Sequence, residues 1–254
     1  MRREFRFARA LTATLVLGLS LTACGDKDAS KSAADGDAGT SANVAPAAKA
    51  LTQANFSERV FTALDKAGSA KVHFETGKGA QKLNGDGEIK YGDDLALRVT
   101  MKVPQQTAGA APQEMLMVGK TFYISMGGKY MTLPLDSFKG MGVPDLSANL
   151  DPKIQAKAFG KAVTKFEQSG APEKLDGVQA TPYRVTLDPT KAPDVYGTTL
   201  TEPITVVYYV GPDDLLRKMV YEDKNGDFIS TYSDWGAPVS IEAPPASQLM
   251  QGAS

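Results

Sequence analysis

The chain has almost none of the side chains on which metal binding and nucleophilic catalysis depend. Its 254 residues include one cysteine, Cys24, and one histidine, His73. A single cysteine excludes a disulfide within the chain, and one cysteine with one histidine excludes the usual zinc-binding sets. A Ser-His catalytic triad would rest on His73 alone, and the Gly-x-Ser-x-Gly elbow of many hydrolases is missing. We therefore predict a protein that is not an enzyme and that uses no cofactor or metal.

Long hydrophobic runs and concentrated positive charge are lacking as well. The apolar stretch ALTATLVLGLSL near the start is shorter than the roughly 20 residues that a membrane-spanning helix needs. The whole chain has 28 basic and 29 acidic residues, a net charge of −1. Without the four arginines and one glutamate of Met1–Ala23, 24 basic and 28 acidic residues remain, a net charge of −4. Nucleic-acid binding requires a concentrated basic face, so we expect no nucleic-acid partner.

What the chain does have at its start is the pattern of an export signal that ends at a cysteine. A basic head, MRREFRFAR, precedes the apolar run, and Leu21-Thr22-Ala23-Cys24 stands where an ordinary signal has an Ala-x-Ala-like site. This arrangement resembles the bacterial lipobox, in which the cysteine thiol receives a diacylglyceryl group and becomes the first residue of the mature chain. We predict a lipoprotein signal peptide over residues 1–23 and lipidation of Cys24, which places the protein on the extracytoplasmic face of the cell membrane.

The residues after Cys24 are predicted to form a tether. The stretch GDKDASKSAADGDAGTSANVAPAAKA has almost no bulky apolar side chain, so it cannot bury enough surface to offset the entropy of ordering. At about 0.8 kcal/mol per buried CH₂, burying even half of a typical pair of acyl chains contributes on the order of 10 kcal/mol to membrane binding, so the anchor is firm. We expect the lipidated cysteine and flexible tether to occupy residues 24–50 and one folded domain to occupy residues 51–250.

The folded domain begins with a helical pattern. Apolar residues at helical spacing in NFSERVFTALDKAG predict an amphipathic helix over about 53–67. Asn55 followed by Glu58 resembles a capping box, and Gly68 is a natural C-terminal stop. A second helix is predicted in LDPKIQAKAF, where Asp151 can cap and Pro152 suits the first helical position.

Most of the remaining sequence has the alternation of half-buried antiparallel strands. In DLALRVTMKV the apolar residues occupy one face and Ala96, Arg98, Thr100 and Lys102 the other. Gly119-Lys120, Gly127-Gly128 and Asn225-Gly226 are typical of hairpin turns. Two helices and about ten strands predict an α+β fold, with helices on one side of a large curved antiparallel sheet.

Two features that could indicate a site have simpler explanations. The carboxylate pairs Asp93-Asp94 and Asp213-Asp214 follow Gly92 and Gly211-Pro212, so turn chemistry accounts for them. The segment DKNGD at 223–227 lacks the downstream glutamate of a calcium loop and connects two predicted strands.

The apolar face of the sheet is the remaining candidate for a site. Methionine, which is common there, is flexible and suits surfaces that accommodate variable ligands, although the same residues could fill a solid core. A curved sheet covered by helices can leave a cavity, and an acyl chain gains about 0.8 kcal/mol per CH₂ on leaving water. The loop PLDSFKGMGVPDLSANL after Leu133 is expected to act as a mobile cover, since long loops are often functional. The candidate lipid-binding residues are Leu97, Val99, Met101, Met115, Met117, Phe122, Ile124, Met126, Phe138 and Met141.

Over about Leu51–Pro245 the chain resembles the LppX/LprG-type lipoproteins of mycobacteria and related actinobacteria. The resemblance rests on QKLNGDGEIKY, VGKTFYISMGGKYMTL, LDGVQATPYRVTLD and TYSDWGAPVSIEAPP, in that order, together with the lipobox at Cys24. It implies a half-barrel sheet with helices packed on its concave side, similar to LolA-like carriers. It also implies a hydrophobic cavity for acylated glycolipids or other long-chain lipids, which are moved from the plasma membrane towards the outer envelope.

Two classes of function remain open from the sequence. The first is a membrane-anchored envelope lipoprotein that binds or transports lipid or glycolipid without catalysis, with an export partner in the envelope. The second is an envelope interaction or signalling module that has a solid core and no lipid cargo. A hydrolase is a weak third class because the catalytic groups are wanting.

Overall fold

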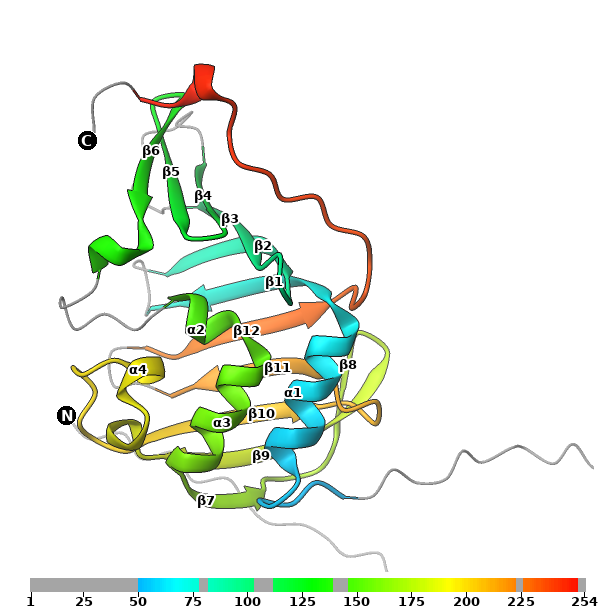
Figure 1. Cartoon of the computed structure of the whole chain (residues 1–254). Helices are drawn as coiled ribbons and strands as arrows, with labels where there is room; N and C mark the ends of the chain where they lie inside the picture. Colours follow the sequence, from blue (N-terminus) through cyan, green and yellow to red (C-terminus); the bar gives the residue numbers. More distant parts are fainter. Residues whose placement is uncertain (1–49, 78–81, 103–111, 139–145, 223–225, 251–254) are drawn as a thin grey trace, which may run out of the picture. The chain divides into compact units, whose positions relative to one another are not determined.

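Twelve antiparallel strands form one large open sheet. The computed structural model describes residues 50–77, 82–102, 112–138, 146–222 and 226–250, all within a compact unit that spans Ala45–Ser254. The strand order is β6-β5-β4-β3-β2-β1-β12-β11-β10-β9-β7, and the short β8 pairs with β9 (Figure 1). The strands are β1 (Ser69–Thr76), β2 (Leu83–Lys90), β3 (Ala96–Lys102), β4 (Gln113–Val118), β5 (Thr121–Met126), β6 (Lys129–Pro134), β7 (Val163–Gln168), β8 (Glu173–Leu175), β9 (Val178–Leu187), β10 (Ile204–Val210), β11 (Leu216–Tyr221) and β12 (Phe228–Ser233).

The order of the strands divides the sheet into two halves that meet at the pairing of β1 with β12. From β1 to β6 each strand pairs with the next along the chain, and the other half runs from β12 back to β9 in the same way, with β7 at the far edge. Lys71 opposes Ser233 and Thr76 opposes Phe228 across the central pair, so the first and last strands of the chain join the halves. This architecture confirms the predicted α+β fold with a large curved antiparallel sheet.

The described helices cover mainly the second of these halves. The helices are α1 (Phe56–Ala67), α2 (Leu146–Leu150), α3 (Pro152–Ala162) and α4 (Pro193–Tyr196), with 3₁₀ helices η2 (Leu135–Phe138), η3 (Pro189–Lys191) and η4 (Ala246–Gln248). Figure 1 shows α1 and α3 side by side across the strands of the second half, on the concave side of the sheet. The two longer helices match the two predicted from periodicity, whereas the short α2 and α4 were not predicted.

The N-terminus of α1 differs from the prediction in its capping. Asn55 Oδ1 accepts a hydrogen bond from the backbone N–H of Thr52 at 2.7 Å and makes no side-chain cap. The expected capping box with Glu58 is therefore wrong, because the preceding turn already uses the acceptor that the box requires. At the other end, Gly68 has φ +74° and its N–H donates to the Leu64 carbonyl, which confirms the predicted stop.

The N-terminus of α3 is capped as the sequence predicts. Asp151 Oδ1 accepts from the backbone N–H groups of Lys153 at 2.8 Å and Ile154 at 3.2 Å, and Pro152 occupies the first helical position. The cap fixes the start of the helix, whose first turn carries Pro152 into the interior of the domain.

Replacing Asp151 by alanine is expected to lower the free energy of unfolding by about 1 kcal/mol, because two backbone donors lose their acceptor. Urea denaturation measures the loss. Asp151→Asn is the matched control, since asparagine caps about as well as aspartate; equal losses in both variants would contradict the capping role.

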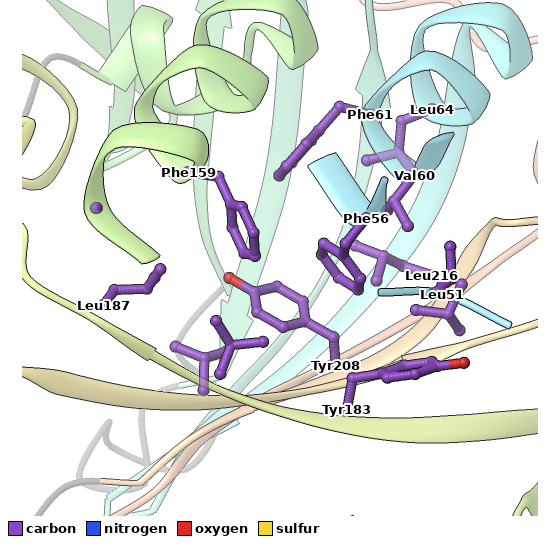
Figure 2. Packing of buried hydrophobic residues seen from close by; sticks show 14 residues of the cluster. Leu51, Phe56, Val60, Phe61, Leu64, Phe159, Tyr183, Leu187, Tyr208 and Leu216 are labelled. Atoms are coloured by element: carbon purple, nitrogen blue, oxygen red, sulfur yellow. The ribbon is translucent and has the colours of Figure 1, made fainter. Parts of the chain in front are cut away.

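The main core lies between α1, α3 and strands β7 to β11. Phe56 is fully buried, and its ring stacks on that of Phe159 with a centroid distance of 5.0 Å. The same ring meets Tyr208 edge-on at 5.4 Å and Phe166 at 5.3 Å. Figure 2 shows the rings of Phe56, Phe159 and Tyr208 between the two helices and the strands below them. This aromatic cluster fixes the helices on the sheet and so defines the space around them.

The C-terminal segment covers part of the other half of the sheet, from its outer face. Ile241 packs with Ala96 and Leu116 in a buried cluster. Farther along, the Met250 N–H donates to the Tyr130 carbonyl at 2.9 Å. Strand alternation places Ala96 on the face opposite to Leu97, so this segment does not cover the apolar face on which the candidate lipid-binding residues were predicted.

Candidate functional site

A cavity of about 260 Å³ lies between the helices and the concave face of the sheet. It is bordered by α1, α2, α3 and α4 on the helix side and by β2 and β9 to β12 on the sheet side. Its apolar wall comprises Phe61, Leu64, Ile89, Leu150, Pro152, Leu187, Ile204, Val206, Leu216 and Met219. Among the described residues, no Lys, Arg, His, Asp or Glu side chain lines it.

Two amide side chains border the cavity and join three helices. Gln155 Nε2 of α3 donates to the backbone oxygen and to Oδ1 of Asn149 of α2, both at 3.1 Å. Asn149 Nδ2 in turn donates to the carbonyl of Val195 in α4 at 2.7 Å. The polar groups at this end of the cavity thus hold α2, α3 and α4 together.

Four tyrosines complete the lining: Tyr91, Tyr196, Tyr208 and Tyr232. Burial raises the pKa of Tyr196 to about 12 and raises the pKa of each of the other three phenols. All four hydroxyls are therefore neutral at physiological pH. They offer hydrogen bonds to a neutral polar group, and their surroundings disfavour a negative charge.

Trp235 packs against two of the tyrosines that line the cavity. Its ring stacks on Tyr232 with a centroid distance of 5.7 Å and on Tyr91 at 6.1 Å. Its indole N–H donates to the Leu216 carbonyl at 2.9 Å. This arrangement fixes two of the four tyrosine rings and ties the segment after β12 to β11.

No protein-family model matches the chain, and no curated protein matches it. Solved structures, in contrast, are similar to the chain. LprF from Mycobacterium bovis is 20% identical with a TM-score of 0.56, and the match covers 76% of this chain and 96% of LprF. The lipoprotein LppX from Mycobacterium tuberculosis is 13% identical with a TM-score of 0.55, and the match covers 75% of this chain and 98% of LppX. The chain has the LppX/LprG-type fold.

In this LppX-type fold the predicted apolar residues of β3, β4 and β5 come together on one face. The register aligns Leu97 with Met117 and Met117 with Phe122. It also aligns the neighbouring row, in which Val99 pairs with Met115 and Met115 with Ile124. Val99, Met117 and Phe122 are buried, whereas Met126, at the end of β5, is 50% exposed.

None of the described candidate residues lines the 260 Å³ cavity. Ile89 of β2 does line it, and Ile89 pairs with Leu97, so the predicted residues continue the cavity's face of the sheet beyond β2. Met101 pairs with Gln113 farther along β3. A lipid-binding role for this outer part of the face remains a prediction.

Several predicted features involve residues that the structure does not describe. The signal peptide over 1–23, Cys24, nearly all of the tether, Met141 and Asn225 lie outside the described residues, and so does part of the expected cover after Leu133. Phe138 closes η2, at the start of that segment. The segment ends in α2, which contributes Asn149 and Leu150 to the cavity.

The single histidine is paired with a carboxylate and lies away from the cavity. His73 Nδ1 is 2.7 Å from Asp86 Oδ1 on β2, and this hydrogen bond raises the His73 pKa. Strand alternation places both residues on the face opposite to Ile89. Among the described residues, no group of three or more His, Cys, Asp or Glu side chains is placed to hold a metal ion. Within the same ranges, no helix is long and apolar enough to cross a membrane.

The carboxylates of the β10–β11 turn are held in ion pairs. Asp214, at φ +64°, accepts from Arg59 Nε at 2.9 Å and from Arg59 Nη2 at 2.6 Å. Asp213 accepts from Arg217 at 2.5 Å. The predicted turn is confirmed, and the Arg59 fork also ties α1 to the sheet. These pairs hold the helix that forms one wall of the cavity.

Proposed function

We propose that the chain is a lipid-anchored protein of the cell envelope that binds or transports an acyl lipid or glycolipid in the cavity beneath α1 and α3, without catalysis. The observation that carries the proposal is the lining of that cavity, which is apolar with neutral tyrosine and amide groups and has no charged side chain among the described residues. An acyl chain gains about 0.8 kcal/mol per CH₂ in such surroundings, and a charged ligand group would lack a partner.

The volume of the cavity sets the scale of the ligand. At about 260 Å³ it lies just below the range of roughly 300–1,000 Å³ that is usual for small-molecule sites. It therefore suits one acyl chain or part of a larger lipid. A glycolipid would place its sugar outside, because sugar hydroxyls need more hydrogen-bonding partners than this lining offers.

The anchor at Cys24 supports the proposed location. A lipobox cysteine followed by a tether over 24–50 would hold the domain at the membrane from which lipid is drawn. LprF and LppX, whose solved structures are similar to this chain, are mycobacterial proteins, and LppX is described as a lipoprotein. A partner in the envelope that supplies or receives the lipid belongs to the same proposal.

Native mass spectrometry of the full chain carrying Cys24→Ser tests the proposal, because this variant has no covalent acyl group that could be mistaken for cargo. We expect bound acyl lipid, and we expect Met219→Trp to reduce it on the order of tenfold, equivalent to about 1.4 kcal/mol, by filling the cavity from β11.

Met115→Trp is the matched control, since Met115 is also half-buried on the same face of the sheet but lies outside the cavity. If only Met115→Trp removed the lipid, the ligand would bind on β3 to β5 instead. A protein that carries no lipid and takes up no fluorescent fatty acid would leave the interaction module as the better explanation.

A further inference from the structure

The outer surface of the helix layer has a groove of about 410 Å³ between α1 and α3. Its walls are facing stripes of the two helices, with Thr62 and Asp65 on α1 and Lys153 and Ala156 on α3. Alanine at the centre of one wall leaves the space open, because its side chain is a single methyl group. The groove is thus a consequence of which residues face each other where the helices pack.

Only a thin layer of side chains separates this groove from the inner cavity. Phe61 of α1 and Pro152 of α3 line both spaces. Figure 2 shows Phe61 projecting from α1 towards α3, beside Phe159, and the two rings lie 6.0 Å apart at an interplanar angle of 63°. A rotation of the Phe61 ring would therefore change the wall of both spaces at once.

The helices are held more firmly at one end of their contact than at the other. They run antiparallel: Phe56 at the start of α1 stacks on Phe159 near the end of α3, while Asp65 near the end of α1 meets Lys153 near the start of α3. The distance from Lys153 Nζ to Asp65 Oδ2 is 3.5 Å, and the Lys153 side chain is 68% exposed, so solvent screens the pair and it holds the helices together only weakly.

Two other walls of the cavity are closed more firmly. The sheet is a continuous hydrogen-bonded layer, and an acyl chain could cross it only if strand pairs broke. At the end formed by α2 and α4, the hydrogen bonds of Gln155 and Asn149 join the helices. The seam between α1 and α3 is held by side-chain packing and one exposed ion pair.

We propose that the α1–α3 groove is the entrance through which an acyl chain reaches the cavity, and that the Phe61 side chain is its gate. This inference rests on the proposed function and adds the route to it. The acyl chain lies along the groove, displaces the Phe61 ring from its place beside Phe159, and enters between Phe61 and Pro152. Outward movement of the Asp65 end of α1 widens the seam, while Phe56 stays packed.

A reversible cross-link across the groove tests the route. Asp65→Cys and Lys153→Cys are introduced together into the full chain with Cys24→Ser and joined by a short thiol reagent that contains a reducible bond. Stopped-flow fluorescence follows the uptake and release of a fluorescent fatty acid. We expect the cross-link to slow both rates at least on the order of tenfold and reduction to restore them, with little change in the affinity after long incubation.

The matched control joins another ion pair. Lys71→Cys and Asp234→Cys replace a pair 2.8 Å apart, and strand alternation places Lys71 on the opposite face of the sheet. The same reagent should leave both rates unchanged there. Phe61→Ala provides a second measurement, in which uptake and release should both become faster, whereas Lys66→Ala, an exposed position of the same helix that lines neither the groove nor the cavity, should not change them.

The outcomes separate the two proposals. Fatty acid that binds at equilibrium but enters the cross-linked protein at the unmodified rate overturns the entrance and leaves the lipid-binding function standing. Unchanged rates in Phe61→Ala overturn the gate. If no form of the protein binds fatty acid at equilibrium, the proposed function fails, and the entrance fails with it.

Discussion

Phe56→Ala is expected to lower the free energy of unfolding by about 3–5 kcal/mol, the range for removing a fully buried phenylalanine. The ring meets aromatic partners on four elements: Phe159 on α3, Phe166 on β7, Tyr183 on β9 and Tyr208 on β10. Alanine would leave a hole that these rings cannot fill without moving the helices. Because natural domains have only about 5–15 kcal/mol of stability in total, a loss of this size is readily measured by urea denaturation.

Phe228→Ala is the matched control for this prediction. Phe228 is half-buried on β12, and the ring contact it makes is a stack on Phe74 with a centroid distance of 6.1 Å. Its removal should cost clearly less than the removal of Phe56. Similar losses in the two variants would show that α1 is not fixed through Phe56, and the proposed movement of α1, in which Phe56 stays packed while the Asp65 end moves outward, would lose its basis.

Much of the fold could be predicted because its determinants are local. The stop of α1 needs a residue at φ +74°, which Gly68 supplies without strain, and the start of α3 needs an acceptor, which Asp151 supplies. Hairpins pair neighbouring strands, and each strand from β2 to β6 pairs with its neighbours along the chain, whereas β1 also pairs with the distant β12. Where two local interactions compete, as at Asn55, the pattern does not decide which one forms.

The position of the cavity could not be predicted because it depends on contacts between distant parts of the chain. Its lining includes Leu64, Leu150 and Tyr232, which come together only when β1 pairs with β12 and the helices fold back over β9 to β12. Alternation in β3 correctly gave the apolar face of the sheet, since Leu97 pairs with the cavity residue Ile89. It could not show which strands of that face the helices cover.

The tyrosines of the cavity show the same difficulty. In EPITVVYYV and in TYSDW, tyrosine fits a half-buried strand whether its hydroxyl meets solvent or a cavity. What distinguishes Tyr208 and Tyr232 is the depth of their burial, which raises the pKa of both phenols. That burial comes from the helices that pack over them. The alternation of residues within a strand gives no information about those helices.

Gly87→Ala is expected to lower the free energy of unfolding by about 1–3 kcal/mol, although it adds only one methyl group. A Cβ at this position of β2 would lie 2.6 Å from the Arg98 carbonyl oxygen and 3.2 Å from methyl groups of Val72 and Val99. The oxygen belongs to the backbone of β3, so relief requires the two strands to move apart. Glycine is needed here because the neighbouring strands and their side chains close over the β2 backbone.

Gly160→Ala should have the opposite effect and is the matched control. Gly160 lies exposed within α3, and a Cβ there would meet nothing within 4 Å. Alanine is the better helix former by about 0.5–1 kcal/mol, so this variant should be more stable than the parent. Chemical denaturation of both variants measures the contrast. If both changes stabilised the protein, the contact between β2 and β3 at Gly87 would be looser than described, and the apolar face could open at the junction between the cavity and the predicted residues of β3 to β5.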